Sequence, residues 1–199
     1  MRFSIYVINN KLGGMKTILQ INSSLFNGSG QSSRLAAELV ETLKKQNSEV
    51  RVMVRDLVKN PLPHLDAARF KSGEGSEELI DELKRADVIV LGVPMYNFGV
   101  PSQLKAWFDH VARAGVTFKY TDQGAVGLLT GKKVYVLATR GGLYAGTAAD
   151  TQTGYVRQFL AFLGLEDVEF IYAEGLAVGA EKRDAALEAA HHQIERIAA

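Results

Sequence analysis

The segment Asp87-Val88-Ile89-Val90-Leu91-Gly92-Val93-Pro94 is an unbroken apolar run that follows a helical pattern and ends at a proline. Strands that are buried on both faces have this composition, and they occur in parallel sheets that helices cover on both sides. Lys133 to Thr139 has the same character. Both segments therefore predict buried strands of a parallel α/β sheet.

Strand and helix patterns alternate on either side of this segment. Further strands are expected at Thr17–Asn22, at Val50–Val54 near a sheet edge, and at Val168–Tyr172. Apolar residues at helical spacing predict helices near 32–46, 76–86, 101–111, 153–163 and 181–197. Residues 56–75, with two prolines and two glycines, are expected to form a loop, and residues 116–129 an extended excursion. The fold class is therefore α/β, a doubly wound five-stranded parallel sheet with helices on both faces, whose strand order the periodicity leaves open.

The composition limits the classes of function. A chain of 199 residues suits one domain, and 23 basic against 22 acidic residues argue against an electrostatic nucleic-acid binder. Without cysteine the chain can form no disulfide or iron–sulfur cluster, so electron transfer would need a bound cofactor. The spacing of histidine and acidic residues suggests no metal site. No apolar run reaches the ~20 residues that span a bilayer, and the start lacks a secretory pattern, so we expect a cytoplasmic protein without a membrane partner.

The first residues are interpreted separately. A second natural start occurs at Met15, from which the chain leads directly into the strand at Thr17. Residues 1–14 are therefore expected to be an upstream-start extension or a cloning remnant, and residues 15–199 the domain. The alternative is a true extra edge strand from Arg2 to Ile8.

Ligands of doubly wound sheets bind outside the carboxyl ends of the strands, where the winding reverses. After the first strand, Ser24 and the loop Gly30-Gln31-Ser32-Ser33 lead into a helix whose free N–H groups favour an anion. No Lys or Arg lies between Ser23 and Ser33, which favours a single phosphomonoester over a polyphosphate. The alternative is an ordinary serine-capped helix after a flexible loop.

Two more strand ends are chemically unusual. Pro94-Met95-Tyr96-Asn97-Phe98-Gly99-Val100-Pro101 crowds large side chains between prolines, and such a stiffened backbone can press against a planar ring. The alternative is a hydrophobic loop that covers the edge of the core. Thr139-Arg140-Gly141-Gly142 joins a hydroxyl to two glycines that permit close backbone approach, with a plain glycine turn as the alternative. All three segments are expected at one edge of the sheet.

Together these segments resemble the FMN-dependent NADH-azoreductases, which are part of the flavodoxin-like NAD(P)H quinone reductases. The likeness runs from Met15 nearly to the C-terminus, and it is most specific in Met95-Tyr96-Asn97-Phe98 and Arg113-Ala114-Gly115-Val116-Thr117-Phe118. The resemblance implies a flavodoxin-like fold and an enzyme that takes hydride from NADH, with NADPH as the alternative donor. Quinones, azo compounds and nitroaromatics are the implied acceptors, in a ping-pong mechanism that cleaves an azo bond to two amines.

The resemblance also implies a homodimer with one noncovalent FMN per subunit at the interface. The implied cofactor residues are Ser24, Gly30, Gln31 and Ser32 for the phosphate and ribityl chain, Pro94, Met95, Tyr96, Asn97 and Phe98 for the ring, and Thr139, Arg140, Gly141 and Gly142 for its pyrimidine end. The implied pocket wall is Phe118, Tyr120 and Phe162, some of them from the partner chain. No catalytic side chain is assigned, because the flavin carries the chemistry.

Three details of this resemblance stay open. Gly30 stands where the family often has a serine, which would remove one hydroxyl contact to the phosphate. The stretch 66–75 is short beside longer members, which leaves the range of acceptors undecided. Arg140 or Lys119 could meet the 2′-phosphate of NADPH.

Two other functions fit the same fold. A flavodoxin-type FMN electron carrier would have no small-molecule substrate of its own, but such carriers tend to be strongly acidic, and this chain has a net charge of +1. A flavin-free regulatory domain would show no flavin spectrum. Turnover with NADH and a quinone in the absence of a partner protein separates an enzyme from a carrier.

Overall fold

The computed structural model describes residues 17–47 and 49–197. The expectation for residues 1–14 lies outside this part of the chain. In sequence order the elements are β1 (Thr17–Asn22), the short 3-10 helix η1 (Asn27–Ser29), α1 (Gln31–Gln46), β2 (Arg51–Asp56), α2 (Ala67–Ser72), α3 (Glu77–Arg85), β3 (Val88–Pro94), α4 (Ser102–Val111), β4 (Phe118–Thr121), β5 (Gly124–Gly127), β6 (Lys133–Thr139), α5 (Thr151–Phe162), β7 (Asp167–Ala173) and α6 (Ala180–Ile197).

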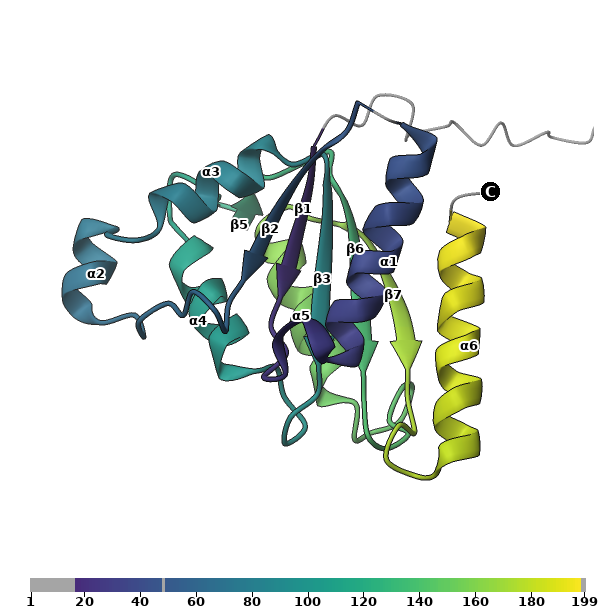
Figure 1. Ribbon diagram of the computed structural model, residues 1–199. Coiled ribbons are helices and arrows are strands. Elements are labelled where there is room, and N and C mark those ends of the chain that lie inside the picture. Colours follow the sequence, from purple (N-terminus) through teal and green to yellow (C-terminus); the bar gives the residue numbers. More distant parts are fainter. Residues whose placement is uncertain (1–16, 48, 198–199) are drawn as a thin grey trace, which may run out of the picture.

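Five strands form one parallel sheet in the order β2-β1-β3-β6-β7, which confirms the predicted fold class. The strand that the sequence marked most clearly, β3, is the central one, and β2 lies at an edge as its alternating pattern predicted. The chain first winds from β1 outward to β2 and then returns to the other side of β1. The winding therefore reverses between β1 and β3. All five arrowheads point the same way in Figure 1, toward the lower edge of the view.

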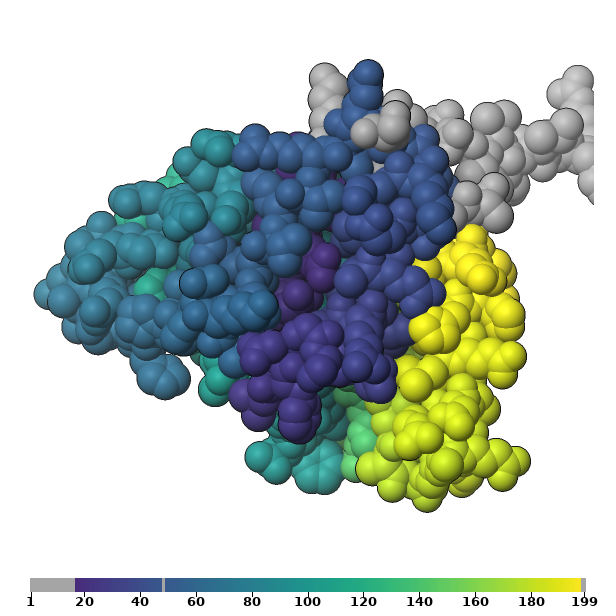
Figure 2. Space-filling model, in the orientation of Figure 1, coloured from purple at the N-terminus to yellow at the C-terminus, as the bar shows by residue number. Residues whose placement is uncertain are grey.

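Helices cover both faces of the sheet, and the central strand shows why. On β3, Val88 and Val90 face the cluster that holds the apolar stripes of α1 and α6. The alternate residues Ile89, Leu91 and Val93 face the cluster of α3, α4 and α5. Helices α1 and α6 contact each other and lie side by side in front of the sheet (Figures 1 and 2). Apolar burial on both faces explains the unbroken apolar run in the sequence.

Two segments differ from the sequence-based expectation. The predicted loop 56–75 contains the short helix α2, which Asp66 caps by accepting a hydrogen bond from Arg69 N, and which ends at Gly73 in the left-handed region. A helix of six residues is too short to produce an apolar periodicity. The predicted excursion 116–129 forms a two-stranded antiparallel hairpin, β4–β5, outside the main sheet.

Ser76 lies at the start of α3, but its side chain does not cap the helix. It makes no capping hydrogen bond to the first turn. Its hydroxyl instead lies 3.4 Å from Nδ1 of His110, whose Nε2 is 2.9 Å from the carbonyl oxygen of Pro63. Because a carbonyl only accepts, Nε2 donates. His110 is buried and joins α4 to the loop before α2, which is a structural role.

Candidate functional site

The three unusual strand ends lie at one edge of the sheet. Strands β1, β3 and β6 are neighbours, and their register places Asn22 beside Gly92 and Pro94 beside Thr139. The loops that follow them therefore start close together, next to the reversal of winding between β1 and β3. This is the position at which doubly wound sheets bind ligands.

The serine loop presents hydroxyls that have no partner within the described chain. The side chains of Ser32 and Ser33 are buried, and neither hydroxyl makes a hydrogen bond to a described residue. Helix α1 begins at Gln31 without a side-chain cap. Buried hydroxyls are almost always hydrogen-bonded in native proteins, and an uncapped helix start offers free N–H groups. This cradle is suited to a small anion such as a phosphate.

The second loop contains a tight turn in a strained conformation. Tyr96 and Gly99 exchange two main-chain hydrogen bonds of 3.2 and 3.0 Å. The residues between them, Asn97 and Phe98, have φ values of 49° and 64°. Left-handed φ costs roughly 1–2 kcal/mol for a residue other than glycine. Strain of this kind persists where the surroundings hold the turn, and it gathers at functional sites.

The start of α5 holds this turn. The Nε2 atom of Gln152 donates to the carbonyl oxygens of Pro94 and Gly99, at 3.0 Å each. The hydroxyl of Thr151 donates to the carbonyl of Phe98 at 2.5 Å. Sequence reasoning assigned no role to either residue and placed the helix start two residues later. A buried glutamine 58 residues from its partner leaves no local signal.

The third loop is shaped by its glycines and by an internal ion cluster. A Cβ atom on Gly142 would lie 2.7 Å from the Tyr144 ring, so a larger residue here would require that ring to move. The Glu174 carboxylate accepts hydrogen bonds from the main-chain N–H groups of Tyr144 and Ala145, at 3.0 and 2.9 Å. These contacts fix the loop that follows Gly142 close to the end of β7. Sequence reasoning gave Glu174 no role.

Arg140 belongs to this cluster and not to an open binding surface. Its fully buried guanidinium donates to Glu174 at 3.0 Å and to Asp150 at 2.9 Å, and it lies over the Tyr172 ring. Its main-chain N–H and carbonyl are bonded to Ala173 and Leu176. The placement of Arg140 therefore does not support the expected contact with a flavin or with the 2′-phosphate of NADPH.

Asp150 anchors the first turn of α5. Burial alone would raise the pKa of this carboxyl, but hydrogen bonds from Thr153 and Arg140 outweigh it and hold the pKa below its usual range. Asp150 accepts from Thr153 N, the position of a helix cap. The ionised Asp150 therefore ties Arg140 to the helix start that carries Gln152.

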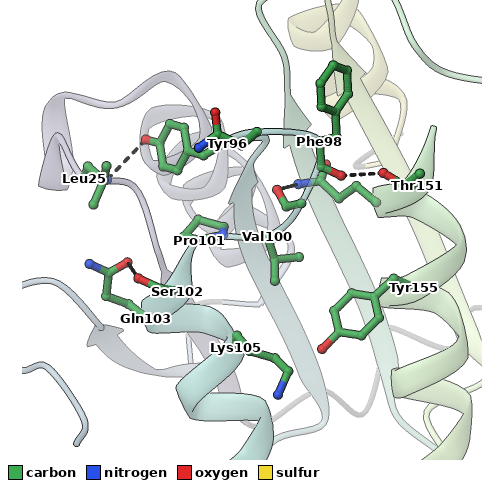
Figure 3. A pocket seen from close by; sticks show the side chains of 13 residues that line it. Leu25, Tyr96, Phe98, Val100, Pro101, Ser102, Gln103, Lys105, Thr151 and Tyr155 are labelled. Atoms are coloured by element: carbon green, nitrogen blue, oxygen red, sulfur yellow. Dashed lines mark hydrogen bonds between the residues drawn. The ribbon is translucent and has the colours of Figure 1, made fainter. Parts of the chain in front are cut away.

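A cavity of about 730 Å³ opens beside the strained turn, between α4 and α5. Its lining is Leu25, Tyr96, Asn97, Phe98, Gly99, Val100, Pro101, Ser102, Gln103, Lys105, Thr151, Gln152 and Tyr155. In Figure 3 the phenol of Tyr155 points into this space from α5, and the Tyr96 hydroxyl accepts from Leu25 N. Burial raises the pKa of Tyr155, so its phenol stays neutral at physiological pH. The volume suits an organic molecule.

The three expected wall aromatics form a separate group. Phe118 lies 4.2 Å from Phe162 and 5.4 Å from Tyr120, measured between ring centroids. Phe162 ends α5, whereas Thr151 at the cavity begins it, so about 16 Å of helix separates the two. Within one chain these aromatics do not line the cavity.

Comparisons with known proteins agree with this geometry. A family model described as "Flavodoxin-like fold" matches residues 16–198. A protein named FMN-dependent NADH:quinone oxidoreductase from Cellvibrio japonicus is 53% identical over 197 residues, which cover 92% of this chain and 98% of that protein. The chain belongs to this flavodoxin-like oxidoreductase family. The predicted family resemblance and the assignment as an oxidoreductase are confirmed.

Solved structures of azoreductases share the architecture of this oxidoreductase. An azoreductase from Bacillus anthracis str. Sterne superposes with a TM-score of 0.83 at 26% identity, over 92% of this chain and 99% of that one. An FMN-dependent NADH-azoreductase from Bacillus anthracis str. Ames Ancestor, solved in complex with FMN, gives 0.82 at 26% identity, over 92% and 98%.

The presence of glycine at position 30 of this oxidoreductase has a steric explanation. A Cβ atom at this position would lie 2.0 Å from the Ser24 hydroxyl oxygen and 2.6 Å from its Cβ. A serine at position 30 would therefore require Ser24 to move. Glycine lets the Ser24 hydroxyl remain at the mouth of the loop, where it accepts a hydrogen bond from Phe26 N at 3.3 Å.

The described part of this oxidoreductase contains neither a candidate metal site nor a candidate membrane-spanning helix. Residues 17–47 and 49–197 contain no group of three or more histidine, aspartate or glutamate side chains that could hold a metal ion. Across the same residues, no helix combines the length and the apolar character that crossing a bilayer requires.

Proposed function

We propose that this oxidoreductase binds FMN at the edge formed by the loops after β1, β3 and β6, and uses it to pass electrons from NADH to quinones. The observation that carries the proposal is the pair of buried, partnerless hydroxyls, Ser32 and Ser33, at the uncapped start of α1. A phosphomonoester would complete their hydrogen bonding. The 53% identical relative is itself named an FMN-dependent NADH:quinone oxidoreductase.

The residues fit this cofactor from its phosphate to its ring. Ser24, Gly30, Gln31 and Ser32 would hold the phosphate and ribityl chain, with Gly30 leaving room beside the Ser24 hydroxyl. The segments Pro94–Phe98 and Thr139–Gly142 would contact the ring, except for Arg140, whose side chain and main-chain polar groups are engaged internally. Bound FMN would supply the hydride chemistry, which needs no acidic or basic side chain.

The chain's own residues would position the substrates and exclude water. The cavity beside Phe98 and Tyr155 is large enough for a nicotinamide or a quinone ring. One such space is consistent with a ping-pong sequence, in which oxidised nicotinamide leaves before the acceptor enters. An azo compound would need two such rounds to yield two amines, and nitroaromatics would be further acceptors. Lys119 remains the candidate for the 2′-phosphate of NADPH.

The enzyme assay has a clear expected result. Purified protein loaded with FMN should oxidise NADH with a quinone as the only acceptor and no partner protein, with kcat in the ordinary range of about 1–1000 s⁻¹. Stopped-flow reduction by NADH and NADPH, followed by reoxidation with quinone and azo compounds, measures the two half-reactions separately. Rapid flavin reduction without turnover on any small acceptor would favour the electron carrier. A protein that takes up no FMN would favour the regulatory domain.

A homodimer would bring the displaced aromatics to the site. Tyr120 is 74% exposed on the β4–β5 hairpin, far from the cavity of its own chain. A second copy could place this residue, with Phe118 and Phe162, over the flavin edge of the first. We expect the 21.7 kDa chain to run at twice its mass in light scattering after gel filtration.

Replacing Tyr120 by alanine should then raise KM for the quinone by roughly 2- to 10-fold, the scale of one aromatic contact. FMN affinity should change much less, because Tyr120 is proposed to meet only the edge of the ring and not the phosphate site at Ser32. Phe70→Ala is the control, since Phe70 is 71% exposed on α2. Equal KM values for both variants, or an active monomeric enzyme, would contradict the proposal that Tyr120 contributes to the site of a second copy. A cytoplasmic location is part of the same proposal, since NADH is a cellular donor.

A further inference from the structure

Gln152 makes two hydrogen bonds that close the ends of one loop. Its side-chain nitrogen lies 3.0 Å from the carbonyl oxygen of Pro94, where β3 ends, and 3.0 Å from that of Gly99, where the turn ends. Both partners are acceptors, so only the NH₂ group of the amide can face them, and each of its two hydrogens is donated to one carbonyl. The orientation of this amide is therefore fixed by its partners.

The amide oxygen of Gln152 indicates that this position has a glutamine because of its NH₂ donor group. Gln152 is 1% exposed, and its Oε1 has no hydrogen-bond partner within the described chain. A buried amide oxygen without a partner destabilises the fold, whereas an apolar side chain of the same shape would avoid that cost. The stabilising contribution of this glutamine therefore lies in holding the two carbonyl groups.

The loop that Gln152 closes is the one with the strained turn. Asn97 and Phe98 both have positive φ, and without bracing such residues relax toward negative φ. Thr151 adds a bond to the carbonyl of Phe98 (Figure 3). The helix start that carries both braces is itself anchored by Asp150 and Arg140. A rigid chain of contacts thus runs from the ion cluster to the turn.

We propose that Gln152 is a positioning residue, which holds Asn97 and Phe98 in the geometry that places the flavin ring and the nicotinamide for electron transfer. This inference rests on the proposed FMN-dependent function. It concerns the ring end of the site, because Gln152 donates its hydrogen bonds to Pro94 and Gly99 and not to the serine loop. Loss of the two hydrogen bonds should change how fast and at what potential the flavin is reduced, while phosphate binding is kept.

The first test uses Gln152→Met, which keeps the length of the side chain and removes both donors. Gln193→Met is the matched control, because Gln193 lies on α6, on the other face of the sheet. With both proteins loaded with FMN, we expect FMN dissociation constants within about threefold of the native value. The rate of flavin reduction by NADH should fall roughly 10- to 100-fold in Gln152→Met alone, as a displacement of about 1 Å can cause. Its visible flavin spectrum and midpoint potential should shift as well.

The second test uses Gln152→Glu and does not depend on the first. A protonated glutamic acid can donate one hydrogen bond to a carbonyl, whereas a carboxylate can only repel both. Burial raises the pKa of such a carboxyl, so protonation is reached near neutrality. We expect the reduction rate of this variant, divided by the native rate, to rise as the pH is lowered from about 8 to about 6. The nearby titratable and charged groups Tyr155, Lys105 and Asp150 are the same in both proteins, so division by the native profile removes any pH dependence that they share.

The outcomes separate this inference from the proposed function. If the native protein binds no FMN or shows no reduction by NADH, the proposed function fails first. If the native protein is active and Gln152→Met has the native rate, spectrum and potential, Gln152 has no positioning role. If Gln152→Met does not fold, the pH profile of Gln152→Glu decides, and a flat ratio across that range overturns the inference.

Discussion

Replacing Arg140 by methionine should lower the free energy of unfolding by about 3–5 kcal/mol. The guanidinium has no exposed surface and pairs with Asp150 and Glu174, so methionine would leave two partly buried carboxylates, 8% and 14% exposed, without their counter-ion. For a chain of this length the loss corresponds to a decrease in Tm of roughly 6–20 °C, measurable by circular dichroism or calorimetry. The FMN-reduction rate should fall too, because Asp150 caps the helix that carries Gln152.

Two companion variants isolate the cause. Arg183→Met removes an exposed pair with Asp184 and should change stability by no more than about 0.5 kcal/mol. Adding Asp150→Asn and Glu174→Gln to Arg140→Met should recover much of the loss, since no charge is then left unpaired. Equal instability of the single and triple variants would point to lost packing against Tyr172 in place of stranded charge.

The same cluster predicts a pH dependence. The native pKa of Asp150 is lower than its usual value, so its contribution to stability is complete above about pH 4 and is lost as the pH falls through the native pKa. The difference in stability between native protein and Arg140→Met should therefore be largest near neutral pH. It should shrink below about pH 4, as Asp150 takes up a proton. A constant difference down to acid pH would contradict the ion-pair explanation.

Replacing Ser32 by aspartate should weaken FMN binding by at least about 100-fold. The Ser32 hydroxyl is buried and partnerless at the start of α1, where the phosphate is proposed to bind. An aspartate there would face the phosphate with a like charge, which costs several kcal/mol, and each 1.4 kcal/mol is about tenfold in affinity. Titration of the apoprotein with FMN, followed by quenching of flavin fluorescence, measures the effect.

Milder and more distant changes complete this test. Ser32→Ala should weaken FMN binding by roughly 10- to 100-fold, because it deletes one hydrogen bond to a charged group. It should leave apoprotein stability unchanged or higher, since the hydroxyl has no partner to lose. Ser29→Asp places the same charge on an exposed neighbour and should alter the affinity by only about threefold. Native affinity in Ser32→Asp would move the phosphate site away from this loop.

Much of the candidate site at the edge of the sheet could be predicted, because the sequence patterns that mark it are local. The apolar run of β3, the hydroxyl-rich loop before α1 and the paired glycines after Thr139 each lie within a few consecutive residues. Parallel strands bring their carboxyl ends to one edge in any order, so the expected meeting of the three loops did not depend on strand order. The role of each residue at that edge, in contrast, depended on the tertiary structure.

Sequence patterns alone determined the α/β class, the positions of the five strands in the parallel sheet, the two covered faces of that sheet and the family. They did so because burial and backbone periodicity are read from neighbouring residues. Tertiary structure decided the strand order, the inward position of Arg140, the grip of Gln152 on a turn more than 50 residues away, and the distance between the Phe118 hairpin and the cavity. Such pairings depend on packing between segments far apart in the chain. A local stretch of sequence therefore does not indicate which distant residues it will contact.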